Sequence, residues 1–392
     1  MSKRSPLPRT VWILGIVSLL MDLSSEIYHA LLPAFITVTL GLPVAAMGAL
    51  DGIAEGAANI AKLVSGRLSD RTQRRKPWVL LGYGMAALSK PLFPLSNGAI
   101  PILGARFVDR VGKGIRGAPR DAMIADETAP ELRGAAFGLR QSLDTVGGFL
   151  APIAAVGLMW ALAGNIRAVF WIAVIPAFLS FAFAALMLRE TRDHAPIKAK
   201  AKFGGFGGLD PQVKRLLGIG MLFGLARFSE GFLILKAMDV GLSATMSPLI
   251  LALFSLAYLL LAYPAGMLSD RIDPRHLLLV GIVTLVVADI WLARSGSIVM
   301  VVFGVLLWGA HMALTQGIFS RMIADAAPEE QRATSFGAFF FVSGIAALLA
   351  SLGAGMLWDR MGPASTFTAG AVVAAAAGVA LFLFPTGRAD RA

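Results

Sequence analysis

Cysteine is absent from this 392-residue chain, and charged residues make up only 15% of it. Without cysteine there can be no disulfide framework, no thiolate metal site and no cysteine nucleophile. The four histidines, His29, His194, His276 and His311, lack the spacing of metal ligands, so we expect no metal and no cofactor. The chain also lacks a G-x-x-x-x-G-K-[ST] loop, which excludes ATP as its energy source.

Apolar residues are abundant instead. They form 57% of the chain, beside 42 glycines, and the mean hydropathy is +0.73. Soluble domains are about 45–50% apolar even when glycine is counted. So much apolar surface cannot be buried in one or two soluble cores, which excludes a disordered chain and nearly excludes a soluble cytosolic enzyme. The surrounding solvent must therefore be a lipid bilayer.

Apolar segments long enough to cross a bilayer recur along the chain. A transmembrane helix needs about 20 mostly apolar residues. The sequence predicts an all-α integral membrane protein with twelve such helices, near residues 11–40, 46–66, 77–96, 99–120, 134–160, 166–188, 215–240, 246–268, 276–294, 297–320, 333–358 and 363–385.

Positive charge is unevenly distributed over the loops. The chain carries a net charge of +11, and with both termini on one side that side collects 24 of the 35 Lys and Arg residues, against three on the other. Cytoplasmic loops are enriched in these residues. We therefore expect a multi-pass protein of the cell inner membrane with both termini in the cytoplasm. The basic character follows from topology, and no nucleic acid partner is expected.

The chain repeats itself at an offset of about 200 residues. Residues 66–71 (GRLSDR) return as 266–271 (GMLSDR), and the triplet 124–126 (IAD) returns as 323–325. Six-helix halves related by an axis along the membrane normal are one of the transporter architectures. We predict an N-terminal half over residues 1–188, a cytoplasmic linker over 189–214 and a C-terminal half over 215–392.

The loop after the second predicted helix carries a recognisable signature. Gly66-x-Leu68-Ser69-Asp70-Arg71, followed by Arg74, Arg75 and Lys76, resembles the loop motif of the major facilitator superfamily, with Gln73 in place of the usual glycine. The second copy keeps Asp270 and Arg271 and then diverges. The resemblance implies a secondary active transporter that works by alternating access, in which Gly66, Asp70, Arg71, Arg74 and Arg75 form a latch. The simpler interpretation is that these basic residues only fix topology.

A second resemblance lies in the fifth predicted helix. Gly138, Gly147 and Pro152 resemble the glycine–proline motif of the proton-driven drug antiporters, with Ala151 where a glycine is expected. This resemblance implies export of a solute in exchange for protons.

Charged residues inside the first predicted helix form one face. Asp22, Glu26 and His29 are spaced i, i+4 and i+7. At a rise of ~1.5 Å per residue from Val11, Asp22 lies ~16 Å deep and Glu26 ~22 Å deep. A carboxyl group in a low-dielectric cavity is harder to ionise than one in water, so both acids are candidates for proton coupling. The alternative is static pairing of these acids with Arg106 or Arg110.

Other intramembrane charges divide between the same two interpretations, since each is costly unless it is paired or hydrated. Arg140 and Asp144 have the spacing of an ion pair within one helix. For this pair and for Asp109, static ion pairing explains the charge at least as well as a role in transport. His311 is expected as a buried core histidine. The candidates for substrate binding are His29, Glu55, Arg106, Arg110, Arg227 and Glu230.

These observations favour a monomeric transporter of a small organic solute, embedded in the lipid bilayer and coupled to protons by antiport. The arginines indicate an acidic or amphiphilic solute. Proton-coupled uptake of an acidic or siderophore-like solute is the alternative. An intramembrane enzyme is a remote alternative, because no nucleophile–base spacing or paired-metal pattern is present, and the same lack leaves no catalytic residue to name.

Overall fold

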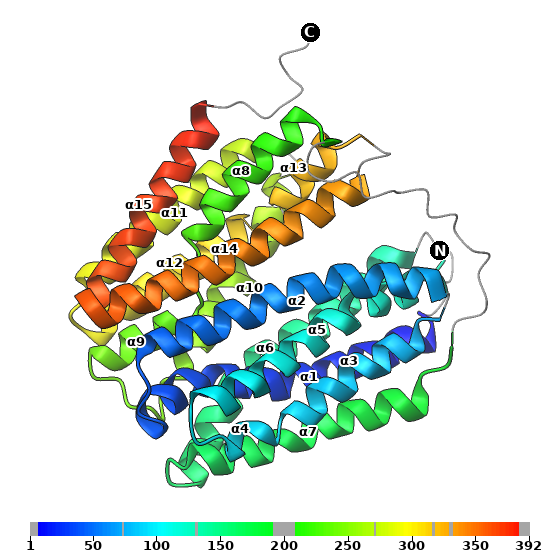
Figure 1. Cartoon of the computed structure of the whole chain (residues 1–392), viewed down its shortest axis with the longest axis horizontal. Coiled ribbons are helices and arrows are strands. Elements are labelled where there is room, and N and C mark those ends of the chain that lie inside the picture. Colours follow the sequence, from blue (N-terminus) through cyan, green and yellow to red (C-terminus); the bar gives the residue numbers. More distant parts are fainter. Residues whose placement is uncertain are drawn as a thin grey trace. The chain divides into compact units, whose positions relative to one another are not determined.

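A computed structural model describes residues 7–72, 74–129, 132–190, 208–269, 272–315, 318–328 and 332–383. All regular elements in these ranges are helices (Figure 1). Their bounds are α1 Arg9–Ala34, the π-helix η1 Phe35–Thr39, α2 Val44–Thr72, α3 Lys76–Ser89, α4 Leu92–Leu95, α5 Ala99–Glu127, α6 Arg133–Ala161, α7 Ile166–Met187, α8 Pro211–Leu225, α9 Gly231–Asp239, α10 Leu249–Ser269, α11 Pro274–Arg294, α12 Ile298–Thr315, α13 Ile318–Ala326, α14 Arg332–Met361 and α15 Pro363–Leu383.

The helices form two compact units. The first unit comprises residues 1–35 and 57–198, and the second comprises residues 36–56 and 199–392. Helix α2 therefore belongs to both units, its first half to the second unit and its second half to the first. Within the first unit α1 packs against α6 and α7, and α3 packs against α5. Within the second unit α11 packs between α12 and α15, while α14 packs against α8.

The composition of the helices explains why they form where they do. Among the described residues, seven helices are long and apolar enough to cross a membrane. Large apolar side chains on their outer faces remain exposed, such as Trp160 at 67% and Leu186 at 78%. In water such surface would be costly, whereas hydrocarbon solvates it, and the intrahelical hydrogen bonds satisfy the backbone. This pattern agrees with the bilayer inferred from the composition.

Local signals set the ends of several helices. Asn165, Asp210 and Asp273 accept a hydrogen bond from a backbone N–H of the first turn that follows each of them. Gly41 and Gly362 adopt positive φ angles of 62° and 82° in the short connections before α2 and α15. Glycine tolerates this left-handed conformation without steric cost, so these connections can be tight.

Every predicted transmembrane segment lies mainly on helix within the described residues, but two of them are not continuous. The segment 77–96 is divided between α3 and α4, and the segment 215–240 between α8 and α9, whereas residues 316 and 317 of the segment 297–320 lie outside the described part. The prediction of one helix over 215–240 is wrong, because residues 226–230 are not helical and Ser229 among them bonds partners on α2 and α14. Ser229 both donates its backbone N–H to Ser351 and bonds Asp51 through its hydroxyl.

Candidate functional site

The face of α1 predicted from spacing is present, and its members differ in their partners. Glu26 Oε2 lies 3.2 Å from His29 Nδ1, and both side chains are mostly buried. Asp22 lies one turn earlier and is half-buried. The structure gives Asp22 no hydrogen bond or ion pair with any described residue, although the charges of Asp144 and Lys113 act on it. Asp22 is therefore an acid held among charges without a direct partner.

Helix α6 approaches Asp22 through a glycine. A Cβ atom placed on Gly147 would lie 3.0 Å from the Leu19 carbonyl oxygen and 3.3 Å from Asp22 Cβ. Only a residue without a side chain lets α6 come this close to α1. The Gly147 of the predicted motif thus borders the acid. Gly138 faces open space, and Pro152 lies buried further along α6.

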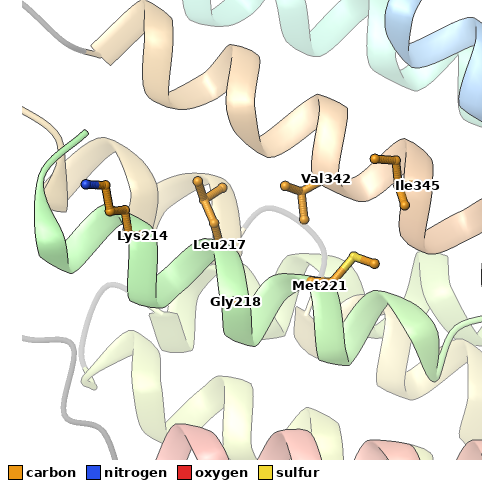
Figure 2. Close-up of a pocket in the computed structure, with 6 residues that line it drawn as sticks. All are labelled: Lys214, Leu217, Gly218, Met221, Val342 and Ile345. Carbon is orange, nitrogen blue, oxygen red and sulfur yellow. The ribbon is translucent and has the colours of Figure 1, made fainter. Parts of the chain in front are cut away.

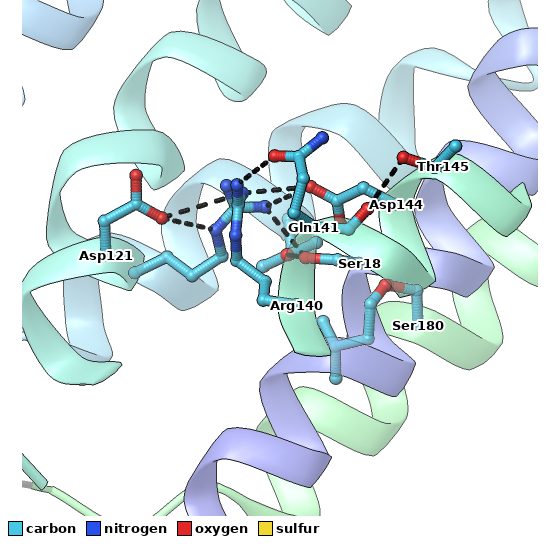
Figure 3. Close-up of polar contacts among 10 residues, drawn as sticks. Ser18, Asp121, Arg140, Gln141, Asp144, Thr145 and Ser180 are labelled. Atoms are coloured by element: carbon cyan, nitrogen blue, oxygen red, sulfur yellow. Dashed lines mark hydrogen bonds and ion pairs between the residues drawn. The ribbon is translucent and has the colours of Figure 1, made fainter. Parts of the chain in front are cut away.

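A network of alternating charges lies between α5 and α6 (Figure 3). Arg140 Nη1 lies 2.9 Å from Asp144 Oδ2 and 3.7 Å from Asp121 Oδ1. Arg120 lies 3.1 Å from Asp121 and 4.0 Å from Asp144, and it donates a 2.8 Å hydrogen bond to Ser18 on α1. The Arg140–Asp144 pair predicted from its one-turn spacing is confirmed. The network connects three helices of the first unit, α1, α5 and α6.

A second acid of the first unit is fully enclosed. Lys90 Nζ lies 2.8 Å from Asp109 Oδ1 and 3.0 Å from Ser25 Oγ, and the two charged side chains are 0% and 3% exposed. The Lys90 ammonium also lies over the Tyr28 ring at 4.9 Å from its centre. Asp109 thus forms an ion pair with Lys90, which agrees with the interpretation of its charge as part of a static ion pair. Sequence reasoning missed Lys90, although a lysine inside an apolar segment is itself a signal.

Two of the predicted substrate-binding residues share this helix. Arg106 and Arg110 are 3% and 5% exposed on α5. The charges of both act on Asp109, and the charge of Arg110 also acts on Glu26. Arg110 thus lies close enough to both Asp109 and Glu26 for its charge to act on each of them.

The loop signature is built around Arg75. Its Nε lies 3.3 Å from Asp126 at the end of α5, and its Nη1 donates a 2.9 Å hydrogen bond to Ser69 of α2. Gly66 allows close packing on α5, because a Cβ placed there would lie 3.2 Å from Ala118 Cβ. Arg74 is exposed. The side chains of Asp70 and Arg71, and the residues Asp270 and Arg271, lie outside the part that the structure describes.

In the second unit, the first half of α2 packs closely on α14. A Cβ on Gly48 would overlap the Ser351 carbonyl oxygen, and one on Gly52 would lie 2.9 Å from Leu348 Cα. Asp359 at the end of α14 accepts hydrogen bonds from the first two backbone N–H groups of α2, at 3.0 and 2.7 Å. Glu55, on the same half of α2, is exposed. We call this contact the α2–α14 seam.

The break between α8 and α9 carries the remaining predicted residues. Arg227 lies over the Phe223 ring at 5.6 Å and donates to the sulfur of Met312. Glu230, directly before α9, acts on Arg227 through its charge. Ser229 lies between them and bonds Asp51 of α2 at 2.6 Å. Sequence reasoning gave Ser229 no role because a serine in an apolar segment carries no signal of its own.

An apolar cavity of about 390 Å³ lies between α8 and α14 (Figure 2). Lys214 lies at one end of it, and the other lining side chains are uncharged. The lining residues are Lys214, Leu217, Gly218, Met221, Val342 and Ile345. Among the described residues, no group of three or more His, Asp or Glu could hold a metal ion.

Comparison with known proteins agrees with this architecture. The Major Facilitator Superfamily profile matches residues 14–238 and 216–392. The chain belongs to the major facilitator superfamily. It is 31% identical over 382 residues to an uncharacterised MFS-type transporter of Methanocaldococcus jannaschii, covering 96% of this chain and 94% of the relative. The family and the fold expected from the loop signature are confirmed.

Solved structures give the same fold at low sequence identity. The nucleoside transporter NupG superposes with a TM-score of 0.80 at 15% identity, covering 96% of this chain and 99% of its own. The human organic anion transporter MFSD10 superposes with a TM-score of 0.67 at 19% identity, covering 96% and 100%. The chain is therefore a membrane-spanning transporter of small molecules, as its family and its apolar helices indicate.

Proposed function

We propose that this transporter exports a small organic solute across the cell inner membrane in exchange for protons, and that it acts as a monomer. Asp22 carries the proposal. It is the acid of the α1 face that has no bonded partner among the described residues, it is half-buried, and it borders Gly147 of the antiporter-like motif. An acid in this position can take up and release a proton without breaking an ion pair.

The other residues of the α1 face have supporting roles in this proposal. The Glu26 carboxylate is in contact with the His29 imidazole, so a proton bound at either group changes the net charge of the pair. Arg110 acts on Glu26 through its charge and Arg106 lies on the same helix, so both can attract an anionic solute toward the acids. In the second unit Arg227, Glu230 and Glu55 are the corresponding candidates for solute binding.

The solute proposed is an organic acid or an amphiphile. Buried arginines favour a carboxylate or phosphate group. The cavity between α8 and α14 joins an apolar lining to the Lys214 ammonium, which suits an apolar body with a negative end. Similarity of fold to an organic anion transporter is consistent with such a solute.

Alternating access needs contacts that form in one state and break in another. The proposed latch is the Arg75–Asp126 pair with Ser69, supported by the close contact of Gly66 with α5. Because both charged groups lie near the ends of their helices, water can reach and separate them at modest cost. The signature residues Asp70, Arg71, Asp270 and Arg271 are proposed to belong to the same gating region.

Purified protein in liposomes that enclose a pH-sensitive dye tests the proposal. Nucleosides, dipeptides and aromatic carboxylic acids are added in turn, each with a radiolabelled form to follow its own movement. Antiport predicts that protons move opposite to at least one solute. Protons that move in the same direction as the solute would instead establish uptake by symport. Solute movement without any proton movement would reject coupling.

A further inference from the structure

Asp289 is an acid of the second unit with an unusual environment. It lies on α11 and is 0% exposed. Its Oδ1 accepts a 2.9 Å hydrogen bond from the indole N–H of Trp308 on α12. Its Oδ2 is buried and has no hydrogen-bond partner among the described residues. One oxygen of this carboxyl group is therefore satisfied and the other is not.

The unsatisfied oxygen points into an enclosure of apolar groups. A Cβ placed on Gly370 of α15 would lie 2.6 Å from Asp289 Oδ2 and 2.9 Å from a ring carbon of Phe228. Phe228 packs against Trp308 at 5.8 Å and against Phe367 at 5.5 Å between ring centres. The absence of a side chain at Gly370 leaves room for the carboxyl group, and a ring carbon of Phe228 borders the same space.

No described cation pairs with Asp289. Helix α15 carries no titratable residue over 363–383. The titratable residue of α12 is His311, and its Nδ1 bonds the carbonyl oxygen of Gly281, which lies eight residues before Asp289 on α11. Arg227 reaches Met312 and Phe223 instead, with Glu230 as its charge partner. Helix α13 also packs on α11, and the side chains of its residues Arg321 and Asp325 lie outside the described part.

A buried carboxylate without a counter-charge is very costly, and such a group takes up a proton instead. A metal ion is a poor occupant because it needs several oxygen ligands, and the described side chains offer only one carboxyl group here. We propose that Asp289 is a proton-binding site of the C-terminal unit, held as the neutral acid while Phe228 covers it. The proposal does not depend on proton exchange at Asp22.

The position of Phe228 suggests when this proton is released. Phe228 lies in the α8–α9 break next to Ser229, which bonds both Asp51 of α2 and Ser351 of α14. Movement of α2 along α14 would pull on Ser229 and withdraw Phe228 from Oδ2. Water would then reach the acid, its O–H bond would break, and the proton would pass to water and leave a carboxylate.

Infrared spectroscopy of the intact protein in lipid tests the site directly, because a protonated carboxyl group absorbs apart from a carboxylate. We expect the wild type at neutral pH to show a protonated-acid carbonyl band that Asp289→Asn removes. Phe228→Ala should speed the deuterium-induced shift of that band, because it opens the site to water. Asp239→Asn is the control and should leave the band intact, since Asp239 is 41% exposed and its carboxylate is paired with Lys236.

Identical carbonyl bands in the wild type and Asp289→Asn would overturn the proposal. If Asp289→Asn does not fold, Trp308→Phe gives the same decision. Loss of the indole hydrogen bond should shift the acid band to higher frequency when Asp289 is protonated. An unshifted band in folded Trp308→Phe would reject the site. Proton flux at Asp22 is measured separately, so either proposal can fail without the other.

Discussion

At the scale of single residues, the structure separates acids that hold helices together from acids that can exchange protons. Asp109 is enclosed with Lys90, and Asp144 is paired with Arg140. Asp22 has neither kind of partner among the described residues. Breaking a buried pair leaves one charge uncompensated, whereas neutralising an unpaired acid removes no ion pair. Stability measurements can therefore distinguish the two groups.

The buried Lys90–Asp109 pair gives the clearest stability prediction. Asp109→Asn should lower the free energy of unfolding by about 3–5 kcal/mol, because Lys90 is left charged and buried. The double variant Lys90→Met/Asp109→Leu should recover much of this loss. Thermal unfolding in detergent measures both. Asp239→Asn is the control, since Asp239 is 41% exposed even though its partner Lys236 is 6% exposed, and we expect a smaller loss than for Asp109→Asn. Equal losses for Asp109→Asn and Asp239→Asn would contradict this account.

Sequence spacing predicts contacts within one helix better than contacts between helices. Arg140 and Asp144, four residues apart, could be paired from the sequence because such residues share a helix face. Lys90 and Asp109 are on different helices, and no spacing rule brings them together. Asp51 and Ser229 are even further apart in the chain, and only the packing of the first half of α2 within the second unit makes them neighbours.

At the scale of helices, small residues determine where two backbones meet. The α2–α14 seam uses Gly48 and Gly52 in successive turns of α2, and Gly355 of α14 faces Ala45. The helix positions could be predicted from long apolar runs. The break at 226–230 could not, because Ser229 there bonds Asp51 of α2 and Ser351 of α14, which lie far from it in the sequence.

Gly48→Ala tests the seam. The added methyl group would overlap the Ser351 carbonyl oxygen, so α2 and α14 must move apart. We expect a loss of about 1–3 kcal/mol in unfolding free energy, as for other overpacked sites. Gly157→Ala on α6 is the matched control, because Gly157 faces open space and alanine there should be neutral or slightly stabilising. A Gly48→Ala protein as stable as Gly157→Ala would show that the seam is not tightly packed.

At the scale of the whole molecule, the distribution of lysine and arginine predicts orientation. The predicted topology places 24 basic residues on one side, those around the linker among them, and three on the other side. The predicted linker at residues 189–214, which divides the two halves, also stays a prediction. The compact units differ from the predicted halves in one respect, because the first half of α2 belongs to the second unit.

The absence of cysteine makes orientation simple to measure. In intact cells, a membrane-impermeant maleimide should label Ser297→Cys, in the connection between α11 and α12, and should not label Lys200→Cys in the linker. The wild type is the control, because it has no cysteine to react. Labelling at position 200 without labelling at position 297 would reverse the predicted topology.

The central claim is that proton binding at Asp22 drives transport. The most direct measurement compares the wild type with Asp22→Asn in liposomes, using a solute that the wild type moves against a proton gradient. Asparagine mimics the protonated acid, so the variant should exchange labelled for unlabelled solute at a rate near that of the wild type. It should also lose accumulation driven by the gradient while keeping the wild-type melting temperature. Full gradient-driven accumulation by a stable Asp22→Asn protein would contradict the account.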